Sequence, residues 1–95
     1  LHAANSRVIV GTLPPAPGAN PAHHGSLIAK QNRDTFNAWL RAGSSPADAI
    51  VDFDACLRDP ANPSALRPSF NSGDSLHPTA AGYEAMANCV DLADL

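Results

Sequence analysis

Asp74 and His77 are the residues of this 95-residue sequence whose types and spacing best suit catalytic chemistry. They lie in the stretch NSGDSLHPTAAGY, residues 71–83, directly before a predicted helix. A neutral imidazole can accept the proton of a serine hydroxyl, while a carboxylate on its other ring nitrogen orients the ring and stabilises its positive charge. Their place on one loop before a helix lets a single turn fix both side chains, which makes Asp74 and His77 candidates for such a pair. By itself, an Asp-x-x-His sequence in a loop is more often a surface turn in which the Asp only accepts backbone hydrogen bonds.

Ser75 lies between these two residues, but its position argues against a role as nucleophile. It is only two residues from His77, which gives its hydroxyl no ready approach to an imidazole that faces Asp74. We therefore predict that Ser75 is not the nucleophile and that His77 would serve a serine elsewhere.

The apolar pattern predicts two strands, at residues 7–13 and 49–53, with a helix at 26–41 between them. Ser26 is the expected N-cap of that helix, and Gly43 its expected stop. Two apolar strands joined by a helix form a βαβ unit, which implies parallel pairing and a right-handed crossover. The predicted fold class is therefore α/β with a parallel sheet.

The second half of the sequence predicts less regular structure. A helical turn is expected at residues 54–58, a long loop at 59–73, and a final helix that begins with Pro78 and ends near Leu92. A parallel sheet is normally covered on both faces, and two strands with two helices would leave apolar edges open. We infer that residues 1–95 are the C-terminal part of a larger domain.

The composition excludes several classes of protein. The net charge is −3 and the six Lys and Arg residues are spread along the sequence, so no basic surface for nucleic acid is predicted. No apolar stretch approaches the roughly 20 residues of a membrane span. The first residues lack the pattern of a signal peptide. Cys56 and Cys89 fit either one disulfide or two buried thiols, and their spacing fits no zinc site.

The motif D-S-L-H-P at residues 74–78, followed by A-A-G-Y at 80–83, resembles the D-x-x-H-P…GY block of the SGNH hydrolases, also called GDSL-type esterases and lipases. VDFDACLRDP at residues 51–60 and VIVGTLPP at 8–15 resemble two strand segments that precede that block in the family. The resemblance implies a three-layer α/β/α, flavodoxin-like fold in which residues 1–95 are the C-terminal part of a single domain. It also implies Asp74 and His77 as the catalytic acid and base.

The same resemblance implies a serine esterase that acts on carboxylic esters through an acyl-serine intermediate, without metal or cofactor. The substrate would be a lipid acyl ester or an acetyl ester of a carbohydrate. In that family the nucleophile directly follows the first strand, and no position before residue 71 matches its nucleophile or oxyanion blocks. A complementary N-terminal chain or segment is therefore expected, the isolated chain should be inactive, and secretion is expected by analogy. The alternative is a non-catalytic, flavodoxin-like binding module.

Other residues suggest weaker hypotheses. The adjacent His23 and His24 are expected to be a solvent-exposed loop rather than a metal site. Asp52 and Asp54 resemble a carboxylate pair, but Asp54 is expected to cap the following helical turn. Two further predictions concern packing: Ile28, Phe36 and Trp39 form core, and Tyr83 packs the final helix under the loop of Asp74 and His77 with its hydroxyl at the surface.

Overall fold

The computed structural model describes residues 4–17 and 25–95. Its helices are α1 (Leu27–Arg41), α2 (Phe53–Leu57) and α3 (Ala80–Cys89), and its strands are β1 (Ile9–Gly11), β2 (Ala49–Val51), β3 (Arg58–Asp59) and β4 (Asn62–Leu66). Two 3₁₀ turns, η3 (Pro68–Phe70) and η4 (Leu92–Asp94), complete the described elements. None of the helices within these ranges is long and apolar enough to cross a membrane.

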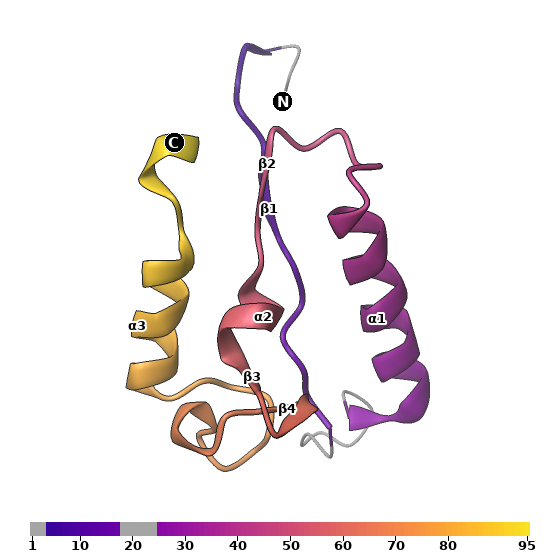
Figure 1. The fold of residues 1–95 in the computed structure, drawn as a ribbon, viewed down its shortest axis with the longest axis vertical. Coiled ribbons are helices and arrows are strands. Elements are labelled where there is room, and N and C mark those ends of the chain that lie inside the picture. The colour runs from indigo at the N-terminus through magenta and orange to yellow at the C-terminus, as the bar shows by residue number, and fades with distance from the viewer. Residues whose placement is uncertain (1–3, 18–24) are drawn as a thin grey trace.

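The predicted βαβ unit is present. β1 and β2 pair in parallel, with Val10 opposite Ile50, and α1 connects them. Figure 1 shows the two strands in the centre, α1 on one side and α3 on the other, so the chain forms three layers. The predicted α/β class with a parallel sheet is therefore confirmed.

The segment predicted to be a loop at residues 59–73 contains regular structure, so that prediction was wrong. β3 and β4 form a short antiparallel hairpin, and η3 follows it. The sequence did not indicate the strand β4 because it contains Pro63, and proline lacks the N–H that a central strand needs. Proline is tolerated in an edge strand. Leu57 and Leu66, 0% and 4% exposed, bracket the hairpin and are both buried.

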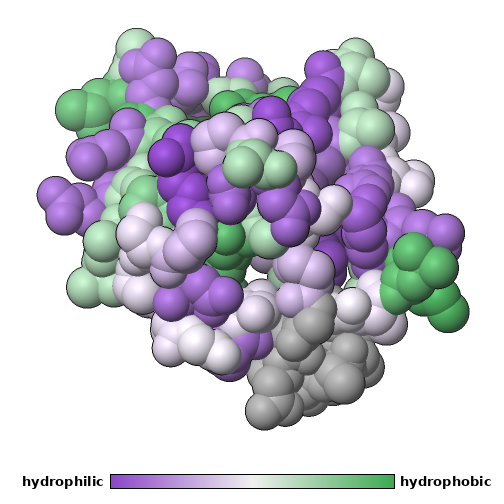
Figure 2. Space-filling model, turned by 60° about the horizontal axis from the view of Figure 1, so that its bottom comes forward, coloured by the Kyte–Doolittle hydropathy of each residue, from purple (hydrophilic) through white to green (hydrophobic). Residues whose placement is uncertain are grey.

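Helix α1 begins as predicted, since the Ser26 hydroxyl accepts a hydrogen bond from the Ala29 N–H. The prediction that Ile28 and Trp39 belong to the core was wrong: they are 70% and 44% exposed. Figure 2 shows a hydrophobic patch at the end of the molecule where α1 starts. The buried face of α1 is formed by Asn37 and Leu40, while Phe36 is half-buried. A sheet of two strands is too narrow to cover the rest of the apolar stripe.

Asn37 attaches α1 to the end of β1. Its side-chain oxygen accepts from the Leu13 N–H at 2.8 Å, and its side-chain nitrogen donates to the Leu13 carbonyl at 2.9 Å. Asn37 is 3% exposed, so these bonds satisfy polar groups that water cannot reach. The amide thus takes the place of a neighbouring strand at Leu13.

Asp52 organises the end of β2, and the prediction that Asp54 caps α2 was wrong. Asp52 is the N-cap and accepts from the Ala55 N–H. It also accepts from the Thr12 hydroxyl at 2.8 Å and from two nitrogens of Arg41, Nε at 2.9 Å and Nη2 at 2.8 Å. Asp54 lies in the first turn of α2, and its side chain binds Arg41 instead.

A disulfide joins Cys56 of α2 to Cys89 of α3. This answers the question that the sequence left open. The bond ties the last helix to the element that follows β2, across 33 residues of sequence. It therefore restricts how far α3 can move from the sheet.

The ion pair between Arg41 and Asp52 makes stability depend on pH. Hydrogen bonds from Arg41 lower the pKa of Asp52 from 3.8 to about 2. Because the pKa is depressed, its stabilising effect is complete above about pH 4 and is lost as the pH falls toward 2. Both side chains are 38% exposed, so we expect Arg41→Gln to lower the free energy of unfolding by about 0.5–1 kcal/mol at pH 7.

Urea unfolding at several pH values measures this effect. The difference between wild type and Arg41→Gln should shrink between pH 4 and the lowest pH at which the transition is complete. Comparing the two proteins cancels the contribution of carboxylates that Arg41 does not contact. A difference that stays constant across this range would show that Asp52 is not the linked group.

Candidate active site

Asp74 and His77 lie on a turn that is closed by backbone hydrogen bonds. Asn71 and Pro78 form an isolated antiparallel bridge. Around it, the Ser72 N–H donates to the His77 carbonyl at 3.1 Å, and the Thr79 N–H donates to the Phe70 carbonyl at 2.9 Å. The two ends of the segment are thereby held side by side, so the residues between them form one compact turn.

The side chain of Asn71 shapes the inside of this turn. Its oxygen accepts from the N–H groups of Gly73 and Ser75, at 2.9 and 3.0 Å. Gly73 has a φ of 116° and Ser75 a φ of 59°. Glycine adopts the first value without steric cost, and the second is a left-handed conformation that few non-glycine residues adopt. The sequence analysis missed this role of Asn71, although an asparagine two residues before glycine is a common turn signal.

The two carboxylate oxygens of Asp74 have different hydrogen-bond partners. Oδ1 accepts from the N–H groups of Leu76 and His77, at 2.9 and 2.8 Å, and from the Ser72 hydroxyl at 3.2 Å. Oδ2 lies 2.5 Å from Nδ1 of His77. The hydrogen bond from His77 and those from the backbone hold the pKa of Asp74 well below its usual range. Asp74 is therefore ionised at neutral pH and acts only as an acceptor.

The ionised carboxylate determines the tautomer of His77. Because Asp74 can only accept, Nδ1 of the imidazole must carry the hydrogen. The neutral ring then presents the lone pair of Nε2, for which no hydrogen-bond partner is found within residues 4–17 and 25–95. The side chain of His77 is 64% exposed. The ring is thus held in one orientation and tautomer, with the lone pair of Nε2 available to accept a proton.

Ser75 lies on the same turn, but the structure engages its side chain elsewhere. The Asn71 side-chain nitrogen donates to the Ser75 hydroxyl oxygen at 3.3 Å. Its backbone is fixed by the second bond to Asn71 described above. The position is that of a turn residue, and the expectation that Ser75 is not the nucleophile stays a prediction.

The first turn of helix α3 packs closely against the turn that carries Asp74 and His77. Its N-cap is Thr79, whose hydroxyl accepts from the Gly82 N–H, so the helix begins two residues later than predicted. The prediction that Pro78 is the first helical residue was wrong, because the bridge to Asn71 keeps Pro78 extended. A Cβ on Gly82 would lie 2.7 Å from Cβ of Pro78. Only glycine allows the first turn of α3 to approach the loop so closely.

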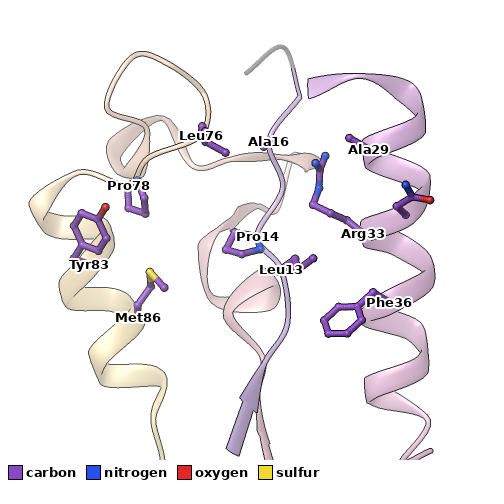
Figure 3. A pocket seen from close by; sticks show the side chains of 11 residues that line it. Leu13, Pro14, Ala16, Ala29, Arg33, Phe36, Leu76, Pro78, Tyr83 and Met86 are labelled. Carbon is purple, nitrogen blue, oxygen red and sulfur yellow. The ribbon is translucent and has the colours of Figure 1, made fainter. Parts of the chain in front are cut away.

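An apolar pocket of about 680 Å³ lies beside the turn. Figure 3 shows it between α1 and α3, with the segment that follows β1 at its centre. Its lining comprises Leu13, Pro14, Ala16, Ala29, Asn32, Arg33, Phe36, Leu76, Pro78, Tyr83 and Met86. Leu76 and Pro78 of the turn line the pocket, whereas His77 between them does not. Tyr83 was expected to pack under the loop, yet it is 53% exposed and faces this pocket.

Two further hypotheses from the sequence concerned the histidines His23 and His24 and the carboxylates Asp52 and Asp54. His23 and His24 lie outside the described residues. Asp52 and Asp54 both bind Arg41. Within the part of the chain that the structure describes, no three His, Cys, Asp or Glu side chains come together in a way that could hold a metal ion.

If Asn71 stabilises the turn, removing its side chain should leave the N–H groups of Gly73 and Ser75 without their hydrogen-bond acceptor. We expect Asn71→Ala to accelerate hydrogen exchange at Gly73 and Ser75 by about three- to ten-fold, since each bond contributes about 0.5–1.5 kcal/mol. The Leu76 and His77 amides, bound by Asp74, should change less. Asn88→Ala, on the exposed face of α3, is the matched control. Equal acceleration at all four amides would show that the whole turn had unfolded instead.

Comparison with known proteins identifies the family of the chain. The family model of the GDSL-like lipases and acylhydrolases matches residues 1–90. The crystal structure of a proposed acylhydrolase from Bacteroides fragilis matches 98% of this chain with a TM-score of 0.75 and 27% sequence identity. The chain spans 44% of the length of that protein. No curated protein matches the sequence. The family resemblance of the motif around Asp74 and His77 is thus confirmed, and the chain belongs to the GDSL-like lipase/acylhydrolase family.

Proposed function

We propose that this chain supplies the acid–base pair of a hydrolase that cleaves carboxylic esters through an acyl-serine intermediate. The observation that carries the proposal is the 2.5 Å contact between Asp74 Oδ2 and His77 Nδ1, on a turn whose backbone Asp74 itself organises. Membership of a lipase/acylhydrolase family supports the same chemistry.

In the proposed mechanism, Nε2 of His77 takes the proton from a serine hydroxyl as the oxygen attacks the ester carbonyl. Asp74 stabilises the imidazolium that forms, because its ionised oxygen lies against Nδ1. His77 then gives the proton to the leaving alcohol. In the second half of the reaction it takes a proton from water as the water oxygen attacks the acyl carbonyl, and it then gives this proton to the serine oxygen as the acid leaves.

We further propose that the serine comes from a complementary N-terminal segment that extends the sheet at β1. In the described residues β1 pairs only with β2. Val8 and Thr12 face β2, since the Val8 carbonyl accepts from the Asp48 N–H and the Thr12 N–H donates to the Val51 carbonyl. The groups of Ile9 and Gly11 between them point to the opposite edge. The apolar pocket lies between the two helix layers at the end of β1 (Figure 3), so another strand would be covered on both faces there.

The proposed reaction implies a class of substrate, and the disulfide implies a compartment. An ester of a lipid acyl chain, or an acetyl ester of a carbohydrate, is the expected substrate class. The disulfide between Cys56 and Cys89 favours secretion, because such bonds persist in oxidising compartments.

Two substitutions test the acid–base pair in the intact protein. His77→Ala removes the proton acceptor, and we expect kcat/KM for a p-nitrophenyl ester to fall by about 10³-fold or more. Asp74→Asn keeps an oxygen for the Leu76 and His77 amides but replaces the acceptor of Nδ1–H. It should lower kcat by about 10²–10⁴-fold while circular dichroism and the unfolding midpoint stay close to wild type.

Ser75→Gly is the matched control. Glycine suits the φ of 59° at this position. The variant loses only the 3.3 Å bond from the Asn71 side chain to the hydroxyl, so it should fold and retain activity within about three-fold. A fluorophosphonate probe should label a serine outside residues 1–95, and His77→Ala should abolish the labelling. Loss of activity in Ser75→Gly, or a label on Ser75, would identify Ser75 as the nucleophile. Unchanged activity in His77→Ala would exclude the proposed mechanism.

A further inference from the structure

The open edge of β1 offers few backbone groups to which another strand can bind. Ile9 and Gly11 direct their N–H and C=O groups to this edge, and Leu13 is the next residue in the same alternating series. Both groups of Leu13 are already bound by Asn37. The Asn37 side-chain oxygen accepts from the Leu13 N–H at 2.8 Å, and its nitrogen donates to the Leu13 carbonyl at 2.9 Å. The edge is therefore open at Gly11 and closed at Leu13.

Two features prevent strand pairing beyond Gly11. Asn37 is 3% exposed, so a strand that displaced it from Leu13 would leave a buried amide without partners, which is unfavourable. Pro15, two positions further along the series, has no N–H to donate. Neither of the next two positions on this edge can thus donate a hydrogen bond to an added strand.

We propose that Asn37 is a positioning residue that ends the pairing of the added strand at Gly11. The inference rests on the added strand of the proposed function, which runs parallel to β1 as β2 does. In a parallel ladder, each bonded residue donates to the C=O of one neighbour and accepts from the N–H two positions later. One residue of the added strand therefore bonds both Ile9 and Gly11.

The residue two positions later in the added strand is the last that can pair. Its N–H donates to the Gly11 C=O. Its own C=O finds no donor on β1, because the N–H of Leu13 is bound to Asn37. The pairing therefore ends at this residue, whatever the sequence of the added strand.

The end of the pairing decides where the added strand leaves the sheet. Leu13 and Pro14 line the apolar pocket together with Leu76 and Pro78, which belong to the turn of the acid–base pair. Figure 3 shows the four side chains around this one pocket. A residue that follows the last paired position therefore emerges beside the pocket, at the carboxyl ends of the strands. The stop thus fixes how far the added strand extends toward the turn.

Scalar couplings across hydrogen bonds test the stop in the intact, isotopically labelled wild-type protein. We expect the amide nitrogen of Leu13 to couple to the side-chain carbonyl carbon of Asn37. The amide nitrogen of Gly11 should couple to a backbone carbonyl carbon outside residues 1–95. A coupling from Leu13 to such a backbone carbonyl would show that pairing continues past Gly11, which overturns the inference but supports the added strand. If neither Ile9 nor Gly11 couples outside residues 1–95, no strand is added at this edge, and both fail.

Asn37→Ala measures the effect of the stop on the reaction. Without the amide the added strand is no longer held at one level, and displacing a reacting group by about 1 Å can cost about 10²-fold in rate. We therefore expect kcat for a p-nitrophenyl ester to fall by about 10-fold or more, while KM changes by less than about three-fold. Circular dichroism restricts the comparison to folded protein.

Gln31→Ala is the control, since it removes an amide from the exposed surface of α1. It should leave kcat and KM within about two-fold of wild type. A wild-type kcat in folded Asn37→Ala would overturn the positioning role. A wild-type protein without esterase activity contradicts the proposed function alone, because the couplings do not depend on catalysis.

Discussion

The candidate site depends on the two carboxylate oxygens of Asp74, which bind different partners. Oδ1 accepts two backbone N–H groups of the turn, while Oδ2 contacts the imidazole of His77. The same side chain thus sets the path of the backbone and the orientation of the ring. Because all of these contacts lie within four residues, the pair needs little from the rest of the fold to adopt its geometry.

The rest of the structure holds this local unit against the sheet. Gly82 allows α3 to approach Pro78, and at its other end α3 is joined to α2 by the disulfide between Cys56 and Cys89. The start of α2 is in turn fixed by Asp52, which binds Thr12 beyond the end of β1. A continuous series of contacts therefore links the turn to the carboxyl ends of both parallel strands, where sites form in open α/β sheets.

How well the sequence predicted each feature follows from the range of the interactions that determine it. The βαβ unit and the pairing of Asp74 with His77 depend on periodicity and on neighbours in sequence, and both were predicted. The burial of Asn37 on α1 was not, because it depends on Leu13, which Asn37 binds from 24 positions away. The N-cap of α2 was assigned to Asp54 rather than Asp52 for the same reason, since Arg41 and Thr12 decide between them. The hairpin at β3–β4 was hidden by a proline.

This difference in range has a consequence for the proposed reaction. The acid–base pair is set by a turn of a few residues, whereas a nucleophile contributed by another strand must be positioned by parallel pairing, which is long-range and costs more loop-closure entropy. The distance from the serine hydroxyl to Nε2 of His77 would then depend on how the added strand aligns with β1. Under the proposed function, substitutions along the open edge of β1 act on the rate through that distance, even though they touch neither His77 nor the substrate.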